Sequence, residues 1–346
     1  MNRIFIILLA VIAIAIPMHQ LSAKDVKATD NVVNIYSSRH YDVDQQLYKL
    51  FEQKTGIKVQ HTESGATEIL EKLKQEGSRS PADLLISVDI GNIWRANTAG
   101  IFEPVSSDVL TKSIPAELRD PGNQWFGISK RARVIFYNKA KVKPDEITSY
   151  EDLADPKWKG RILVRPSSNV YNQSLVASII AADGIEAAEK WAKGLITNLA
   201  KAPSGNDVEL IRDVANGEAD VTFANTYYFA RMMQSDKPAM REAASKVGWV
   251  FPNQNGRGAH INISGMGLIK NARHKDNAIK FMEFLVSPEA QEIFAASNNE
   301  YPVISGVAEN STVKSLGTFK SDSVHLADIG KNSVEAIKLM DRAGWK

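Results

Sequence analysis

The chain has 346 residues, with 42 Lys and Arg, 40 Asp and Glu, six His and no Cys, for a formal net charge of +2. This chain is too long to fold around one ordinary hydrophobic core, so about two domains are expected. Its composition, with 24% charged and 44% hydrophobic residues, is typical of a globular protein and excludes a disordered chain, a collagen or a coiled coil. The near-neutral charge does not favour nucleic-acid binding, and the lack of Cys excludes thiolate metal sites, disulfides and Cys nucleophiles.

The first segment has the pattern of an export signal. Arg3 gives a short positive region, and residues 4–16 carry no polar side chain. Small residues before Lys24 mark a cleavage point, so residues 1–23 are predicted to be a signal peptide. The apolar run of 13 residues is shorter than the roughly 20 needed to cross a bilayer. We therefore expect a protein exported to the periplasm, with no membrane span after cleavage.

Strands and helices alternate along the rest of the chain. Apolar runs with β-branched residues predict strands, and apolar residues at helical spacing predict helices, several of them ended by Gly or begun by a capping residue. In chain order we predict strand 32–36, helix 44–54, strand 57–60, helix 68–75, strands 83–87, 133–137 and 161–164, helices 172–182, 186–194 and 207–216, strand 220–224, helix 229–233, strand 262–269 interrupted by its glycines, a helix capped by Ser287, and a final helix near 333–340. This pattern predicts an α/β protein whose sheet is covered by helices on both faces.

No linker or change of composition divides the chain. Two α/β lobes joined by several chain crossings fit this better than two domains joined once, and such lobes would close about a cleft like a hinge. We place crossings near 129–133 and 256–260. Gly256 and Gly258 could absorb the backbone change at the second crossing, although an ordinary loop would explain them equally well.

The sequence lacks the common enzyme motifs, such as a P-loop, Gly-x-Ser-x-Gly or His-Glu-x-x-His. Two aromatic pairs are more informative. His40-Tyr41 follows the first predicted strand, and Tyr227-Tyr228 follows strand 220–224. Both therefore lie where a strand passes into a helix, which is where open α/β sheets place ligands.

The geometry of Tyr227-Tyr228 permits a shared ligand. In the first turn of a helix, successive side chains diverge by about 100°, so two phenol oxygens could occupy neighbouring corners of one coordination sphere. We expect Thr226 to cap that turn. The alternative for an isolated tyrosine pair is that one ring packs in the core and the other is exposed.

Several segments together carry a family resemblance. They are Ser37-Ser38-Arg39-His40-Tyr41, residues 165–172 (Arg-Pro-Ser-Ser-Asn-Val-Tyr-Asn), residues 224–231 (Ala-Asn-Thr-Tyr-Tyr-Phe-Ala-Arg), residues 284–291 and residues 299–303. In order and type they resemble periplasmic ferric-iron-binding proteins of iron ABC transporters (Fbp/Fut/Idi-like), over essentially the whole mature chain. The resemblance implies a type II periplasmic-binding-protein fold, with a ligand cleft between two lobes that each hold a mixed sheet flanked by helices. We assign 31–132 plus 259–309 to lobe 1 and 133–258 plus 310–346 to lobe 2.

The resemblance also implies a ligand set and partners. The iron ligands would be His40, Tyr41, Tyr171, Tyr227 and Tyr228. Other members use a Glu ligand after the strand that matches 83–87, and this chain has Val88 at that place. We therefore expect it to belong to the tyrosine-rich subgroup, which needs no added anion. Asp89 remains open as a substitute for the missing Glu. The implied partners are permease and ATPase subunits of an ABC transporter, and we expect a monomer that is no enzyme and carries no organic cofactor.

The residue chemistry suits a hard trivalent ion. Oxygen donors favour hard cations, and binding would deprotonate each phenol. Four phenolates and a neutral imidazole would give −1 with Fe(III) and −2 with Fe(II), so both oxidation states stay under consideration. Arg231 and Arg39 are candidates to offset this charge, and surface or interlobe ion pairs are the alternative roles for both.

Two other functions remain open at this stage. The same fold could bind a polyamine, a thiamine-like compound or an organic anion, with the tyrosines acting as an aromatic box or as hydrogen-bond donors. The acidic pairs expected for a polyamine do not flank the tyrosines, and an anion would instead use Ser167-Ser168 at the start of the following helix. An exported hydrolase is disfavoured because no nucleophile–base motif is found.

Overall fold

Strands and helices alternate along residues 31–346, which are the residues described by this computed structural model; the predicted signal peptide, 1–23, lies outside them. The elements with their bounds are β1 Val32–Ser37, α1 Asp42–Thr55, β2 Lys58–Glu63, α2 Ala66–Glu76, β3 Leu84–Val88, α3 Ile90–Thr98, α4 Asp108–Ser113, β4 Phe126–Asn138, β5 Ile162–Leu163, α5 Val170–Asp183, α6 Ile185–Thr197, α7 Asp207–Asn216, β6 Val221–Asn225, α8 Thr226–Gln234, α9 Pro238–Lys246, β7 Val247–Val250, β8 Ile261–Leu268, α10 Lys275–Leu285, α11 Pro288–Asn298, α12 Ser311–Ser315 and α13 Leu326–Arg342.

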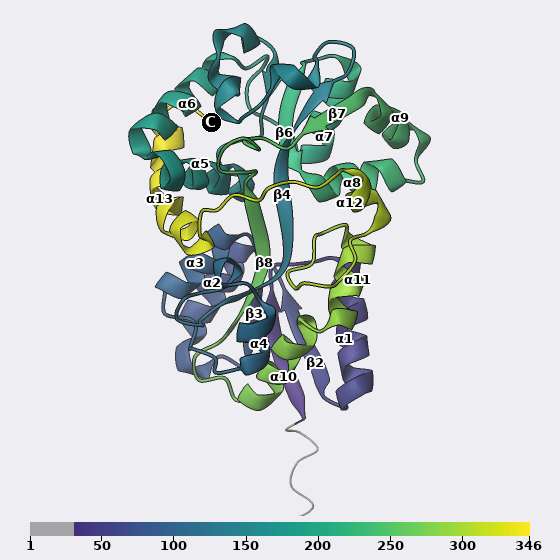
Figure 1. The fold of residues 1–346 in the computed structure, drawn as a ribbon. Coiled ribbons are helices and arrows are strands. Elements are labelled where there is room, and N and C mark those ends of the chain that lie inside the picture. The colour runs from purple at the N-terminus through teal and green to yellow at the C-terminus, as the bar shows by residue number, and fades with distance from the viewer. Residues whose placement is uncertain (1–30) are drawn as a thin grey trace, which may run out of the picture.

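The sheet is mixed, as the sequence predicted. Its strand order is β2-β1-β3-β8-β4-β6-β5, with β7 paired to β4. The β1–β2, β1–β3 and β5–β6 pairs are parallel, and the pairs that β4 and β8 make are antiparallel. Helices cover the strands in both halves of the molecule (Figure 1).

Strand β4 passes from one half of the molecule to the other. Its first part, through Ala132, pairs with β8, and from Arg133 onward it pairs with β6 and β7. Figure 1 shows β4 and β8 running between a lower group of elements around β1–β3 and an upper group around β6 and β7. The change of partner falls within the first predicted crossing, 129–133.

Local sequence explains where many elements begin and end. Gly56 ends α1 in the left-handed conformation with φ 71°, and Ser287 caps α11 by accepting a hydrogen bond from the Ala290 N–H. Strand β8 is uninterrupted, although we had expected its glycines to break it. A Cβ on Gly265 would lie 2.5 Å from Ile93, and one on Gly267 would lie 2.5 Å from Phe102. These glycines therefore let neighbouring segments pack directly on the strand.

Other sequence expectations were wrong in detail. Thr226 does not cap α8: it is the first residue of the helix, and Asn225 holds the N-cap position without a side-chain hydrogen bond. The last helix begins at Leu326, well before 333, and His325 caps it. Gly330 lies within this helix, and a Cβ there would lie 2.7 Å from the Trp94 ring, so packing requires a glycine at this position. The sequence analysis also missed several elements, namely helices α3, α4, α9, α10 and α12 and strand β7.

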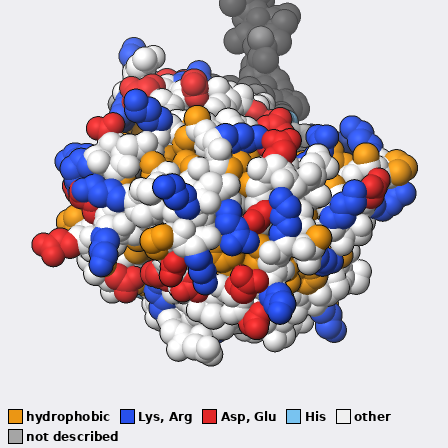
Figure 2. All heavy atoms as spheres, turned by 90° about the horizontal axis from the view of Figure 1, so that it is seen from above, with side chains coloured by type: hydrophobic (Ala, Val, Ile, Leu, Met, Phe, Trp, Pro, Cys, Tyr) orange, Lys and Arg blue, Asp and Glu red, His pale blue; other side chains and the backbone are white. Residues whose placement is uncertain are grey.

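No helix among residues 31–346 is long and apolar enough to cross a membrane. The surface is mixed in charge, in keeping with the small net charge of the chain. Figure 2 shows Lys and Arg side chains interspersed with Asp and Glu over one end of the molecule.

Candidate metal centre

Four tyrosines from three separate segments lie close together. Tyr41 stands between β1 and α1, and Tyr171 lies in the first turn of α5. Tyr227 and Tyr228 lie in the first turn of α8, with ring centroids 4.2 Å apart and planes tilted by 36°. The Tyr227 hydroxyl donates a hydrogen bond to the Tyr171 hydroxyl at 3.3 Å. We call these four residues the tyrosine cluster.

The environment of the tyrosine cluster keeps its phenols protonated. Burial, with a smaller contribution from the neighbouring Tyr171 phenol, raises the pKa of Tyr41 to about 12, while Arg39 opposes the rise. Burial also raises the pKa values of Tyr171, Tyr227 and Tyr228. A neighbouring phenol adds to the rise at Tyr171 and Tyr227, and the Asp207 carboxylate adds to it at Tyr228. Each phenol is therefore neutral at pH 7 unless a cation binds it.

His40 lies at the edge of this cluster. Its side chain is exposed, and its ring centroid is 5.7 Å from that of Tyr41. Together with Tyr41 and Arg231 it lines a cavity of about 760 Å³ that is bounded by α1, α8 and the end of α11. The structure therefore groups four of the five predicted ligands and leaves His40 beside them at the rim.

Arg231 contacts the tyrosine cluster directly. Its guanidinium carbon is 5.2 Å from the ring centroid of Tyr41 and 5.2 Å from that of Tyr227. It donates a hydrogen bond to the Asn298 side chain, and among the described residues it has no carboxylate within salt-bridge distance. Its positive charge is therefore available to the cluster.

Arg39 is placed differently. Its guanidinium carbon is 4.8 Å from the Tyr41 ring centroid, but the side chain is buried and pairs with Asp44 at 3.1 Å and Glu300 at 3.3 Å. Two carboxylates thus balance this one cation. Arg39 fixes the segment that carries Tyr41 rather than supplying free positive charge.

Sequence analysis missed Arg131. It is 2% exposed, its guanidinium carbon is 5.2 Å from the Tyr171 ring centroid, and it pairs with Asp89 at 3.3 Å. The signal was present in strand β4, where Arg131 and Arg133 are two residues apart. Side chains at this spacing point to one face of a strand, so both arginines were candidates for the cleft.

Asp89 is not a free metal ligand. One of its oxygens accepts hydrogen bonds from the Gly91 N–H at 2.9 Å and from the Ser174 hydroxyl, and the other pairs with Arg131. The carboxylate is fully buried and caps α3. Asp89, which the sequence left open as a substitute for the Glu, therefore has both carboxylate oxygens engaged in structural contacts.

A buried ion-pair group supports two of the tyrosine-bearing segments. Asp207 is 0% exposed and lies between Arg133, 3.1 Å away, and Arg165. Arg133 also donates to the side chains of Asn172 at 2.7 Å and Asn225 at 3.2 Å. These two residues adjoin the tyrosines of α5 and α8, so the group holds both segments in register.

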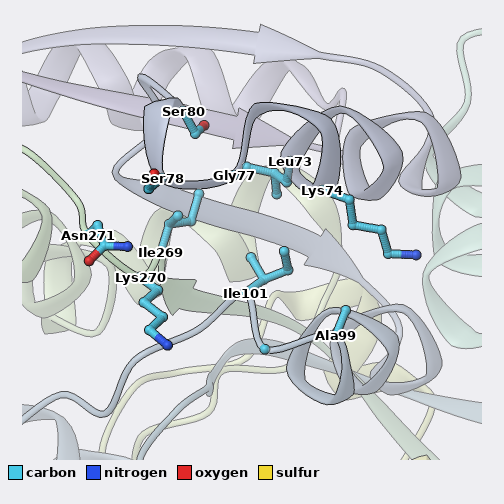
Figure 3. A pocket seen from close by; sticks show the side chains of 11 residues that line it. Leu73, Lys74, Gly77, Ser78, Ser80, Ala99, Ile101, Ile269, Lys270 and Asn271 are labelled. Atoms are coloured by element: carbon cyan, nitrogen blue, oxygen red, sulfur yellow. The ribbon is translucent and has the colours of Figure 1, made fainter.

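Another cavity lies away from the tyrosines. It has a volume of about 330 Å³ and is lined by α2, the segment that follows it and residues 99–101 and 269–271 (Figure 3). Lys74 and Lys270 border it, and no Tyr or His lines it. It therefore contains none of the predicted ligands.

The arrangement is suited to a hard cation. The described residues contain no group of three or more His, Asp and Glu that could hold a metal, so phenol oxygens are the concentrated donor set. Phenolate oxygens favour hard, highly charged ions over soft ones. Binding such an ion would replace up to four phenol protons.

Known proteins resemble this chain closely. The model of a family described as bacterial extracellular solute-binding protein matches residues 79–321. Iron uptake protein A1 of Synechocystis sp. is 52% identical over 322 residues, which are 93% of this chain and 89% of that protein. The major ferric iron-binding protein of Neisseria meningitidis is 29% identical over 319 residues, 91% of this chain and 93% of that protein.

Solved structures of iron-binding proteins also resemble this chain. The Trichodesmium protein IdiA (FutA), in complex with iron and citrate ligands, superimposes with a TM-score of 0.88 and 56% identity over 91% of this chain and 100% of that one. A ferric binding protein from Campylobacter jejuni gives a TM-score of 0.86 with 46% identity, over 91% of this chain and 100% of that one.

Proposed function

This chain belongs to the bacterial extracellular solute-binding proteins, and from that premise we propose that it captures Fe(III) between two lobes and delivers it to an ABC transporter of the inner membrane. The observation that carries the proposal is the convergence of four phenols from three segments, one of them buried and three half-buried. Similarity to iron uptake and ferric-iron-binding proteins over nine-tenths of the chain supports it.

In this proposal the iron ligands are His40, Tyr41, Tyr171, Tyr227 and Tyr228. The phenols are held within reach of one another, and His40 reaches the ion by a rotation of its exposed side chain. Four phenolates leave a net charge of −1 on the Fe(III) complex and −2 on an Fe(II) complex. Arg231 offsets part of this charge because it lies against two of the rings and has no acidic partner among the described residues.

The lobes in this proposal are 31–132 plus 259–309 and 133–258 plus 310–346. The change of strand partners within β4 supports the boundary at 132/133. Contacts of α12 with α8 and of α13 with α5 and α6 support the placement of the C-terminal segment. Closure would bring Tyr41 of one lobe to the three tyrosines of the other, and the closed form is the state that a transporter recognises.

We also propose where the protein works and with which partners. Residues 1–23 direct the chain to the periplasm and are removed, and the mature protein works there as a monomer. It binds and releases iron without catalysing a reaction, and its partners are the permease and ATPase subunits of the transporter.

The test is a titration of the metal-stripped mature protein with chelated ferric iron, followed by visible absorption. We expect a tyrosinate-to-iron charge-transfer band that saturates at one equivalent and is lost in the Tyr227→Phe/Tyr228→Phe double variant. The matched control is Tyr36→Phe, because the Tyr36 hydroxyl donates to Glu76 at 2.9 Å, outside the cluster. The absence of a band with ferric iron, together with no binding of ferrous iron in an anaerobic titration, would overturn the proposal in favour of an organic ligand.

A further inference from the structure

A basic cavity lies beside the segment that carries Tyr171. It has a volume of about 460 Å³ and lies between α3 and the segment that leads into α5. Its wall includes Arg95, Arg165, Ser168 and Asn169, and none of the residues that line it is acidic. Val170 also lines it, and the next residue in the chain, Tyr171, is a proposed iron ligand.

The two arginines carry positive charge that neighbouring acids leave uncompensated. Arg95 bonds to the Gly91 carbonyl at 3.3 Å and to the Asn92 side chain, and among the described residues no carboxylate lies within salt-bridge distance of it. Arg165 shares the single carboxylate of Asp207 with Arg133. The Nε of Arg165 is buried and has no hydrogen-bond partner in the part of the chain that the structure describes.

The size and charge of this cavity define what it would hold. An iron ion with one water would occupy a small part of the volume, because a water molecule takes about 30 Å³ in the liquid. Guanidinium groups bind carboxylates through two parallel hydrogen bonds, and amide and hydroxyl side chains add neutral polar contacts. Fe(III) is kept in solution at neutral pH by oxygen-rich chelators, many of which are polycarboxylates with net negative charge.

We propose that this cavity docks the anionic polycarboxylate chelate that brings Fe(III) to the tyrosine cluster. The inference rests on the proposed function and names the substrate class of that same site. Arg165 connects the two regions, since its guanidinium carbon is 5.9 Å from the Tyr171 ring centroid.

Transfer then proceeds by ligand exchange. Each Fe–carboxylate bond that breaks is replaced by an Fe–phenolate bond, and the phenol proton passes to the departing carboxylate or to water. The iron remains Fe(III) throughout, so the exchange needs no electron donor.

The other cavity at the cluster is a poorer dock for an anion. Asp42 lines the cavity beside His40, and Arg231 there is directed at the Tyr41 and Tyr227 rings and at Asn298. Anions are therefore favoured at the Arg95 side of the cluster.

The experiment is stopped-flow loading of the metal-free mature protein, followed by the charge-transfer band. Ferric nitrilotriacetate is the anionic donor, and a neutral ferric tris-hydroxamate is the comparison. Arg95→Gln removes the charge and keeps a polar side chain, and Arg95→Lys restores the charge. Arg241→Gln is the matched control, because Arg241 lies exposed on α9 and its guanidinium bonds the Ser235 carbonyl.

We expect Arg95→Gln to slow loading from the anionic donor about three- to tenfold at low ionic strength, with no change for the neutral donor. Arg95→Lys should recover most of the rate, Arg241→Gln should match wild type, and about 0.5 M salt should remove the difference. Equal rates for Arg95→Gln and wild type, or equal slowing with both donors, would overturn the docking site. In either case a band that still saturates at one equivalent would leave the iron site standing, whereas its absence from wild type would refute the iron site itself.

Discussion

Iron binding should depend steeply on pH, and removal of one phenol should reduce that dependence by a fixed amount. The perturbation is Tyr41→Phe, which keeps the ring beside Arg39 and removes the hydroxyl. Burial holds the Tyr41 pKa at about 12, and the other three phenols also have raised pKa values. All four are therefore protonated below pH 9, and each must lose its proton to bind iron.

The magnitude follows from proton linkage. Ionising a phenol of pKa about 12 at pH 7 costs about 7 kcal/mol, which the metal bond must offset. Because the cation binds the deprotonated form, apparent affinity falls as pH falls, by tenfold per pH unit for each proton displaced. Four phenols give a slope of about four in log K against pH, and the Tyr41→Phe variant should give about three.

The assay is competition with a chelator of known proton stoichiometry between about pH 6 and 8, followed by the charge-transfer band. Proton release into weakly buffered solution provides an independent count. Tyr36→Phe should keep the wild-type slope, because the Tyr36 hydroxyl bonds Glu76 outside the cluster. A wild-type slope of one or less, or an unchanged slope in Tyr41→Phe, would refute ligation by four phenolates.

Three further changes test the surroundings of the cluster. Asp207→Asn leaves the buried Arg133 and the half-buried Arg165 without their carboxylate, so we expect a loss of about 3–5 kcal/mol in the free energy of unfolding and a fall in melting temperature of about 5–8 °C. Arg231→Ala should weaken Fe(II) binding about ten- to hundredfold more than Fe(III) binding, because it removes a positive charge beside the more negative complex, as measured by anaerobic and aerobic titrations. Ser174→Ala removes the hydroxyl that donates to buried Asp89 between the proposed lobes, so iron affinity should fall about tenfold while the position of the charge-transfer band stays the same.

Each of these changes has a control or a contrary outcome. Asp213→Asn is matched to Asp207→Asn because it lies on the same helix and pairs with Lys201 at the surface, where the loss should stay below about 1 kcal/mol. Equal melting temperatures for the two variants would contradict a buried ion-pair role. An unchanged ratio of Fe(II) to Fe(III) affinity would remove Arg231 from charge compensation. A shifted band in Ser174→Ala would mean that the substitution disturbs the ligands rather than closure.

Local chemistry in the sequence determined the elements and the identity of the candidate ligands. Periodicity and capping located β1, α1, α7 and β6 to within about two residues, because the forces that form them act between residues near in sequence. The position of Tyr227 and Tyr228 in the first turn of a helix follows from the same local rules. The mixed α/β class followed from the alternation of strands and helices.

Tertiary structure decided which charges act at the cluster. Arg231 was the first candidate by sequence and Arg39 the second, and only the structure separates their roles. Asp44 and Glu300 neutralise Arg39, while Arg231 lies against two tyrosine rings. Glu300 is far from Arg39 in the chain, and no local pattern predicts such a contact. The glycines in β8 misled the sequence analysis for the same reason. These glycines leave room for side chains from segments distant in the sequence, and only the tertiary structure shows which side chains pack there.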